Sequence, residues 1–402
     1  MQNKMTNLPQ GWEVKKFEEI ANIKGGKRLP KGENLLDNNT KFTYIRVADF
    51  QDNGTINLQN IKFINENTYN VLKNYKIYDD NLYISIAGTI GKSGIIPKEL
   101  NGAILTENAV KLEYIQNNIS NKFMYFFTLS NIFKTQIQTS TKIVAQPKLA
   151  ITRLKQIQIP LPPLKEQERI VGILDESFAK IDESIKILEQ NLLNLDELMQ
   201  SALQKAFNPL KDNAKENYKL PQGWEWKSLE EISENISAGG DKPKNCTESK
   251  TAKNQIPVYA NGVNNNGLVG YTDKATIIKP SLTISARGTI GFVCIRKEPY
   301  FPIVRLISLI PCENILCLHY LYFCLNFFIA KGEGSSIPQL TIPKFKSLQI
   351  PLPPLKEQEQ IAKHLDFVFE KTKALKELYT KELKDYEELK QSLLNKAFKG
   401  EL

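Results

Sequence analysis

The feature that most constrains this chain is an internal duplication. The ten residues Ile159-Pro-Leu-Pro-Pro-Leu-Lys-Glu-Gln-Glu168 recur unchanged as Ile350-Pro-Leu-Pro-Pro-Leu-Lys-Glu-Gln-Glu359, 191 positions later. The same spacing relates Gln200-Ser-Ala-Leu-Gln-Lys-Ala-Phe207 to Gln391-Ser-Leu-Leu-Asn-Lys-Ala-Phe398. Repetition on this scale indicates one supersecondary unit that folds twice. We therefore predict two globular units, each followed by a similar long segment.

Two further repeats show how the units differ. Leu8-Pro-Gln-Gly-Trp-Glu13 returns 212 positions later as Leu220-Pro-Gln-Gly-Trp-Glu225, and Ser85-Ile-Ala-Gly-Thr-Ile-Gly91 returns 200 positions later as Ser285-Ala-Arg-Gly-Thr-Ile-Gly291. The spacing falls from 212 through 200 to 191, so the first unit is longer before and after the glycine motif, while the long segments match without gaps. We expect a shared frame with different loops.

The glycine motif is not a phosphate-binding loop. Gly91-Lys-Ser93 imitates the end of a P-loop, but such a loop has four residues between its glycines, and Gly88 and Gly91 are separated by two. In the second copy Phe292 replaces the lysine. We predict a strand, a tight turn and a strand, with glycines where the backbone turns or closely approaches a neighbour.

Composition is that of a globular protein of two or more domains. Of the 402 residues, 41% are hydrophobic and 24% charged, and no run of 18 apolar residues could cross a bilayer. The first residues lack the apolar core of a signal peptide, so we expect a cytoplasmic location. Short β-branched and aromatic runs predict strands at residues 42–47, 82–86 and 282–285, and apolar helices are predicted near residues 119–133 and 316–330.

The repeated prolines predict where a long helix begins. Pro160, Pro162 and Pro163 force an extended exit, so the helix starts after them. About 43 residues from 164 to 206 would span roughly 65 Å, and Asn208-Pro209 is expected to end the helix. Apolar residues at steps of three and four form the stripe of a coiled coil: Phe178, Ile181, Ile185, Leu188, Leu192, Leu195 and Met199.

The second copy predicts a matching helix over residues 355–398, with Gly400 as its cap. Its stripe is interrupted, because Lys376 and Lys390 stand where the first copy has apolar residues. Two such helices in one chain most simply pack on each other in antiparallel fashion; the alternative is that each pairs with another chain as a dimerisation rod. The residues of this stripe are Leu365, Phe369, Thr372, Tyr379, Leu383, Tyr386 and Leu393.

The formal charge of +9 is unevenly distributed along the chain. Residues 1–163 carry +8 and residues 219–349 carry +5, whereas residues 164–207 carry −4 and residues 350–402 are neutral. The basic excess therefore belongs to the two globular units. This distribution indicates two polyanion-binding domains joined by helices with another role; the alternative is basic charge that serves solubility alone.

Neither a metal site nor an active site can be identified from motifs. The five cysteines lie in the second unit without the spacing of a disulfide framework or a zinc site, so we interpret Cys312, Cys317 and Cys324 as buried residues of a core helix. The only histidines, His319 and His364, stand beside no plausible nucleophile. No dinucleotide-binding motif, amino-methyltransferase tetrapeptide or Gly-x-Ser-x-Gly occurs.

Taken together, the motif order resembles a known family. Leu-Pro-x-Gly-Trp-Glu, Gly-Thr-Ile-Gly, Ile-Pro-Leu-Pro-Pro-Leu-x-Glu-Gln and a long helix, all present twice, are similar to the DNA specificity subunit of type I restriction-modification systems, over nearly the whole length. The resemblance implies an α+β fold with a pseudo-twofold repeat. Its parts would be target-recognition domains at 1–163 and 220–354, spacer helices at 164–208 and 355–402, and a linker at 209–219.

The same resemblance implies a function without catalysis in this chain. It would read two half-sites of an asymmetric, interrupted double-stranded DNA target, with the helices setting the gap. Two methyltransferase (M) subunits would use S-adenosylmethionine, and restriction (R) subunits would use ATP and Mg. Alternatives are a related system with a fused methylase-nuclease partner, a DNA-modifying enzyme, and a coiled-coil scaffold that binds RNA or acidic proteins.

Candidate DNA-binding residues are chosen by type and position, since Arg and Lys suit guanine and phosphate whereas Asn and Gln suit adenine. For each one, a role as plain solvated surface is the alternative. In the first unit they are Lys24, Lys27, Arg28, Lys31, Arg46, Lys92, Thr141, Lys142 and Gln146. In the second unit they are Lys242, Lys244, Asn261, Asn264, Asn265, Arg287, Ser335, Ser336 and Gln339.

Overall fold

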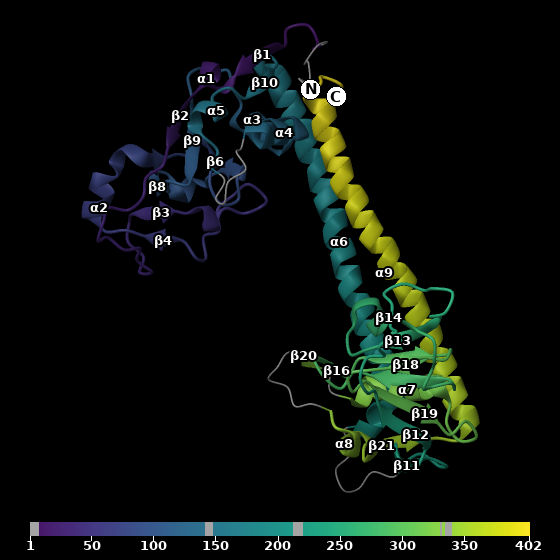
Figure 1. Ribbon diagram of the computed structural model, residues 1–402. Helices are drawn as coiled ribbons and strands as arrows, with labels where there is room; N and C mark the ends of the chain where they lie inside the picture. Colours follow the sequence, from purple (N-terminus) through teal and green to yellow (C-terminus); the bar gives the residue numbers. More distant parts are fainter. Residues whose placement is uncertain (1–7, 141–147, 212–219, 330–331, 334–339) are drawn as a thin grey trace. The chain divides into compact units, whose positions relative to one another are not determined.

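The computed structural model describes residues 8–140, 148–211, 220–329, 332–333 and 340–402 (Figure 1). These residues form two compact units. Unit 1 comprises Met1–Leu188 and Lys381–Leu402, and unit 2 comprises Glu189–Thr380. Each unit therefore contains one globular part and a segment of both long helices. The linker expected at 209–219 falls mostly outside the described residues.

Unit 1 is built on two four-stranded sheets. In the first, with the order β2-β9-β6-β7, all neighbours are antiparallel. In the second, with the order β4-β3-β8-β5, β3 and β8 are parallel. The strands are β2 (Ala21–Gly25), β3 (Thr43–Ile45), β4 (Lys62–Phe63), β5 (Lys76–Ile77), β6 (Leu82–Ser85), β7 (Ser93–Ile95), β8 (Ala103–Leu105) and β9 (Ala109–Tyr114). Short helices are α1 (Phe17–Ile20), α2 (Glu66–Val71) and α5 (Ile151–Leu154).

Unit 2 repeats this topology, except that its second sheet has one strand fewer, and no strand in the described part of the unit is equivalent to β5. Its four-stranded sheet has the order β12-β19-β15-β17, and its three-stranded sheet the order β14-β13-β18, with β13 and β18 parallel. The strands are β12 (Ser233–Ala238), β13 (Ile256–Tyr259), β14 (Leu268–Thr272), β15 (Ser281–Ile284), β16 (Thr289–Ile290), β17 (Val293–Arg296), β18 (Phe301–Pro302), β19 (Ile307–Pro311) and β20 (Gly332–Glu333). The predicted duplication and the three predicted strands are confirmed.

The first and last motifs of each unit are repeated together because they pair with each other. In unit 1, β1 (Glu13–Lys16) is antiparallel to β10 (Gln158–Leu161), and in unit 2, β11 (Glu225–Ser228) is antiparallel to β21 (Gln349–Leu352). A two-stranded ribbon has only edge strands, which tolerate proline. The turn before each ribbon needs a glycine, since Gly11 and Gly223 have φ values of +84° and +85°.

The predicted helix at 119–133 is two helices. Helix α3 (Asn121–Leu129) ends at Ser130, and α4 (Asn131–Ser140) follows. The Ser130 hydroxyl donates to the carbonyl of Phe127 at 2.6 Å and accepts the amide of Phe133 at 3.3 Å. The side chain of this buried serine thus competes with the helical hydrogen bonds. In unit 2 the counterpart, α7 (Leu318–Phe328), is a single helix as predicted, and α8 (Ile342–Lys346) comes later.

The long helices are α6 (Leu164–Lys211) and α9 (Leu355–Ala397). Buried residues recur every seven positions in α6, at Leu174, Ile181, Leu188 and Leu195, as a coiled coil requires. Phe178, Ile185, Leu192 and Met199 between them are half-buried. The prediction that Asn208-Pro209 ends α6 is wrong by a few residues, because a proline in the last turn removes one amide donor without ending the helix before it.

The two helices are antiparallel within each unit. In unit 1, Arg169 donates to the carbonyl of Leu402 at 2.8 Å, and Lys390 forms an ion pair with Asp182. In unit 2, Lys376 forms an ion pair with Asp196. The lysines that interrupt the predicted apolar stripe thus face carboxylates on the other helix. Along the second helix, Leu365 and Thr372 are buried, and Phe369, Tyr379, Leu383, Tyr386 and Leu393 are half-buried.

Each long helix ends in the core of a unit. Phe398, directly after α9, lies against Phe127 of α3, with ring centroids 5.3 Å apart, and its repeat equivalent Phe207 of α6 lies against Tyr320 of α7 at 5.7 Å. Gly400 follows with φ +74°, which confirms its predicted role as the cap of α9. The repeated Ala-Phe is therefore the point at which each long helix anchors in the core of a unit.

The glutamine of the repeated Lys-Glu-Gln holds each globular part on its long helix. Gln167, which is buried, donates to the carbonyls of Pro162 and Asn118 at 2.9 and 3.1 Å and accepts the amide of Ser120, the N-cap of α3, at 2.8 Å. In unit 2, Gln358 makes the same three bonds, to the carbonyls of Pro353 and Ile315 and the amide of Cys317, at 2.8, 2.8 and 2.9 Å.

The cysteines are unpaired thiols. Cys324 is fully buried in α7, as predicted, and burial raises the pKa of its thiol. Cys312 and Cys317 are only half-buried and precede the helix, so the prediction that all three lie buried on it is wrong. Over the described part of the chain, no helix is both long and apolar enough for a bilayer.

Candidate nucleic-acid interface

Three loops of unit 2 meet where strands β13, β15 and β18 end. The parallel pairing of β13 with β18 brings residues 260–267 and 303–306 to the same end of the sheet. The glycine motif after β15 lies beside them, since Ile284 pairs with Ile307 and the amide of Gly262 donates to the Ser285 hydroxyl at 3.3 Å. This position at the ends of strands is where variable loops can differ without changing the frame.

Asn261 connects the three loops. Its side-chain oxygen accepts the amide of Ala286 at 2.8 Å, and its side-chain nitrogen donates to the carbonyl of Val304 at 2.6 Å. The sequence predicted Asn261 as a DNA contact, and in the structure both ends of its amide are engaged within the protein. The residues next to its two partners, Arg287 and Arg305, are exposed on either side.

The loop at Val304 and Arg305 has an unusual backbone. Their φ values are +53° and +59°, in the left-handed region that residues other than glycine seldom adopt. Hydrogen bonds of 2.8 Å from their amides to Gly240 and Gly239 hold them in place. A Cβ atom on Gly239 would lie 2.6 Å from the amide nitrogen of Ile303, so only glycine permits this approach.

Arg296 holds the asparagine-rich loop, residues 264–267, through a hydrogen bond to its backbone. It was not among the residues predicted from the sequence. It is buried, donates to the carbonyl of Asn266 and to the Thr283 hydroxyl at 3.0 Å, and its guanidinium lies 3.6 Å from the Tyr259 ring centroid. A buried guanidinium with these partners is structural. Its position directly after the apolar run Val293-Cys-Ile295 was the only indication in the sequence.

The other candidates in unit 2 remain available to a ligand. Lys242, Lys244, Asn264, Asn265 and Arg287 are all exposed. Asn265 has φ +47°, and the adjacent Asn266 +52°, which displays a turn of asparagines toward solvent. Within the described residues, Lys242, Lys244 and Arg287 form no ion pair. Their role in binding DNA stays a prediction.

The candidates of unit 1 are mostly engaged with carboxylates. Arg46 makes a bidentate contact with the buried Asp49, at 3.0 and 2.5 Å, and also donates to the carbonyl of Asn60. This arrangement closes the turn after β3. Lys92, beside the glycine motif, forms an ion pair of 2.8 Å with the fully exposed Asp52. An exposed pair of this kind is weak, so Lys92 can exchange its partner for a phosphate.

The other basic segment of unit 1 carries two more ion pairs; Lys24, predicted in a loop, lies in strand β2, and Arg28 lies in the loop that follows it. Arg28 donates to Glu107 at 2.7 Å, and Lys24 contacts Glu113 at 2.5 Å. Burial raises the pKa of Glu107, but hydrogen bonds from Arg28 and Thr106 outweigh it, so the pKa lies below its usual value. Of the remaining candidates in this loop, Lys27 lies 5.9 Å from the Tyr75 ring centroid and Lys31 is exposed.

Six predicted residues lie outside the described residues: Thr141, Lys142, Gln146, Ser335, Ser336 and Gln339. The described residues that follow both segments lie beside the glycine motifs. Leu149 donates its amide to the carbonyl of Ile86 at 2.8 Å, and its repeat equivalent Leu340 donates to Ala286 at 3.1 Å. Wherever the structure is described, it contains no group of three His, Cys, Asp or Glu side chains that could hold a metal ion.

Sequence comparison places the chain in a family. The model of the type I restriction modification DNA specificity domain matches it twice, over residues 9–193 and 221–385. The chain belongs to this family. The two matched segments correspond to the duplication, since each covers one globular part and much of one long helix. The unit that we derived from the repeat is therefore the specificity domain of the family.

Relatives and solved structures agree with this assignment to the specificity family. A putative type I specificity subunit of Mycoplasma pneumoniae is 30% identical over 353 residues, which cover 87% of each chain. The putative MjaX specificity subunit of Methanocaldococcus jannaschii is 24% identical and spans 98% of this chain and 94% of that one. Two solved structures, each 20% identical, share the fold. A chain from a study of type I R-M complex assembly has a TM-score of 0.80 over 98% of this chain, and the HsdS subunit of Thermoanaerobacter tengcongensis has 0.61 over 100%.

Proposed function

We propose that this chain selects the DNA target of a type I restriction-modification complex by reading a bipartite, asymmetric sequence, one half-site with each unit. Methylation of adenine and cleavage of DNA belong, in this proposal, to M and R subunits that bind S-adenosylmethionine, ATP and Mg. The chain itself supplies recognition and a frame. Double-stranded DNA is the ligand of the interface loops.

One observation carries this proposal. Two copies of one sheet topology present different side chains from equivalent loops, with mostly paired cations in unit 1 and exposed Arg287, Lys242 and Lys244 in unit 2. Two recognition surfaces on a common frame are what an asymmetric target requires. The charges of +8 and +5 on the globular parts favour a polyanion, with affinity that falls steeply as salt rises.

The helices offer equivalent surfaces to a protein partner. Each exposes two aliphatic side chains 11 residues apart, which is about three turns and therefore the same face. In α6 these are Ile187 and Leu198, 55% and 50% exposed, and in α9 they are Leu378 and Leu389, 56% and 45% exposed. Ile187 and Leu378, like Leu198 and Leu389, occupy equivalent repeat positions. Two matching patches suit two copies of one M subunit.

The test of the function is base-resolved methylation mapping of the host genome with this gene intact and deleted. We expect a two-part, gapped adenine motif that disappears on deletion and returns when the gene is restored. Exchange of residues 1–163 for the corresponding part of another specificity subunit should then change one half of the motif. If methylation is the same in all strains while the M subunits are expressed, the proposal is wrong.

A second experiment tests whether the helices set the gap. Deletion of residues 188–194 together with 379–385 removes one heptad from each helix between the Asp182–Lys390 and Asp196–Lys376 ion pairs, so the apolar stripe stays in phase. The shortening is about 10 Å, or about three base pairs. Both half-sites should persist with a smaller gap. A deletion variant that methylates the original gap would refute this part of the proposal.

A further inference from the structure

Arg305 of unit 2 and Asn108 of unit 1 occupy equivalent positions. Both follow a strand that pairs in parallel, β18 or β8, and precede one that pairs antiparallel, β19 or β9. The backbone bonds agree, since the amide of Ile303 donates to Tyr259 as that of Thr106 donates to Ile45. Gly239 likewise donates to Leu306 as Gly26 donates to Ala109. The two residues thus lie in the same connection between the two sheets of a unit.

The exposed position of Arg305 depends on a strained backbone. A residue other than glycine is strained in the left-handed region and persists there only where the surrounding contacts hold its backbone in place. Val304 and Arg305 are such residues in succession, held by Asn261, Gly239 and Gly240. Such strain concentrates at binding sites, because it fixes where a side chain emerges. Arg305 is exposed, and its guanidinium has no partner among the described residues.

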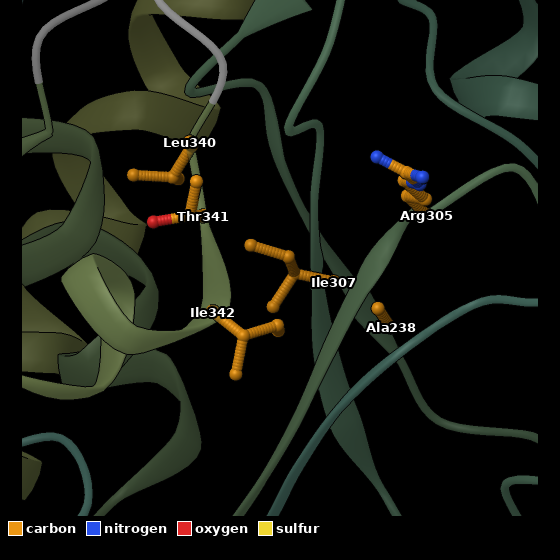
Figure 2. A pocket seen from close by; sticks show the side chains of 6 residues that line it. All are labelled: Ala238, Arg305, Ile307, Leu340, Thr341 and Ile342. Atoms are coloured by element: carbon orange, nitrogen blue, oxygen red, sulfur yellow. The ribbon is translucent and has the colours of Figure 1, made fainter.

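A pocket lies beside Arg305 (Figure 2). Its other lining residues are mostly apolar: Ala238 and Ile307 from the sheet, and Leu340, Thr341 and Ile342 at the start of α8. The amide of Leu340 donates a hydrogen bond to the carbonyl of Ala286, next to Arg287, so the pocket also adjoins the glycine motif. The Arg305 guanidinium beside a mostly apolar pocket is complementary to the major-groove edge of DNA, where hydrogen-bond acceptors and a thymine methyl group lie side by side.

Asn108 gives unit 1 a different chemistry at the same place. Its carbonyl accepts the amides of Ile86 and Ala87, at 2.8 and 3.3 Å, so its backbone is fixed beside the glycine motif. Its side-chain amide is half-buried and bonds to none of the residues that the structure describes. An amide presents an NH2 donor group beside a carbonyl acceptor, which together fit adenine, whereas a guanidinium presents donors only, two of which can bind the two acceptors of guanine.

We propose that Arg305 reads a guanine of the second half-site and that Asn108 reads an adenine of the first. This inference rests on the function proposed above and adds the residues that distinguish the two half-sites. The position before β19 in unit 2 and before β9 in unit 1 is then the same recognition position, used once in each unit. Arg305 was absent from the candidates chosen by sequence, because nothing in the sequence distinguishes it from other exposed cations.

The test replaces these residues in the chain assembled with its M partner and maps methylated sequences. Arg305→Asn should make one position of the second half-site accept adenine, and lower methylation of the original sequence by about 10- to 100-fold. The first half-site should be unchanged. Asn108→Arg should alter one position of the first half-site alone. Arg305→Gly should make the same second-half position degenerate, and it should fold, because glycine accepts the left-handed backbone.

Lys297→Asn is the matched control, since it removes one exposed positive charge at the far end of β17 from the glycine motif. It should leave the motif intact. If Arg305→Gly and Arg305→Asn keep the wild-type motif, or weaken all sequences equally as a phosphate contact would, the assignment of Arg305 is overturned while the proposed function stands. If the wild-type chain directs no gapped motif, the proposed function itself fails, and the inference with it.

Discussion

Replacement of Gln167 by alanine should loosen the first recognition domain from its helix. The Gln167 side chain makes three hydrogen bonds, of 2.8, 2.9 and 3.1 Å, to the backbone of Ser120, Pro162 and Asn118. These residues belong to the start of α3 and to the proline exit, so one side chain joins the domain, the ribbon and the helix. Only 1% of its surface is exposed, so water cannot readily replace it.

The magnitude follows from the groups left without partners. A buried donor or acceptor that loses its partner costs about 1–3 kcal/mol. Gln167→Ala leaves one amide and two carbonyls in this state, and partial hydration reduces the sum, so we expect the free energy of unfolding of unit 1 to fall by about 3–5 kcal/mol. Gln167→Glu should cost at least as much, because its carboxylate would face the carbonyls of Pro162 and Asn118.

Hydrogen exchange of the α3 amides is the appropriate assay, because a chain of two units need not unfold in one step. Protection in α3 should fall by two or more orders of magnitude in Gln167→Ala while α7 is unaffected. Gln358→Ala should give the reverse pattern. Gln190→Ala, at an exposed position of α6, should change little and is the control. If protection in Gln167→Ala matches that in Gln190→Ala, the account of this contact is wrong.

Three further predictions concern other contacts. Asp182→Lys places two lysines opposite each other and should lower the free energy of unfolding by about 0.5–1 kcal/mol, and adding Lys390→Asp should restore it. A double-mutant cycle measured by denaturant unfolding checks this, and a coupling energy of zero would show that the ion pair does not stabilise the protein. Because the pKa of Glu107 beside Arg28 is lowered in the folded state, its carboxylate stabilises the fold above pH about 4.3, and this stabilisation is lost as the pH falls through the folded pKa. Glu107→Gln should therefore make the free energy of unfolding depend less on pH in this acid range. An unchanged pH dependence would contradict this. Gly239→Ala should destabilise unit 2 and disturb second half-site recognition, because its Cβ would meet the backbone of Ile303, and wild-type melting and binding would refute this.

Much of the architecture was predictable because its causes are local or periodic. The repeat required two similar units, the prolines set the start of each long helix, and the spacing of Ile181, Leu188 and Leu195 predicted the buried stripe, which the structure extends to Leu174. Gly400 was predictable as a cap because only its own backbone conformation is needed. The break at Ser130 was not, since a serine can lie in a helix or compete with it.

Which candidate side chains are paired within the protein could not be predicted, because residue type does not reveal pairing. Arg28 and Arg287 look alike in the sequence, yet one faces Glu107 and the other is exposed without an ion pair in the described parts. Asn261 was predicted as a DNA contact, and in the structure its amide joins two loops of the protein. These differences arise from residues more than 20 positions apart in the chain, whose contacts exist only once the sheets have formed.

By itself, the sequence determined the duplication, the helices and the place of the basic charge, because repetition, periodicity and composition are properties of neighbouring residues. Only the tertiary structure decided that the first and last motifs of a unit pair as a ribbon, and that Gln167 and Gln358 hold the domains. It also decided that Arg305 emerges from a strained joint beside a pocket. Such features depend on backbone groups brought together from distant segments, and hydrogen bonding at those junctions is specified by geometry rather than by residue type.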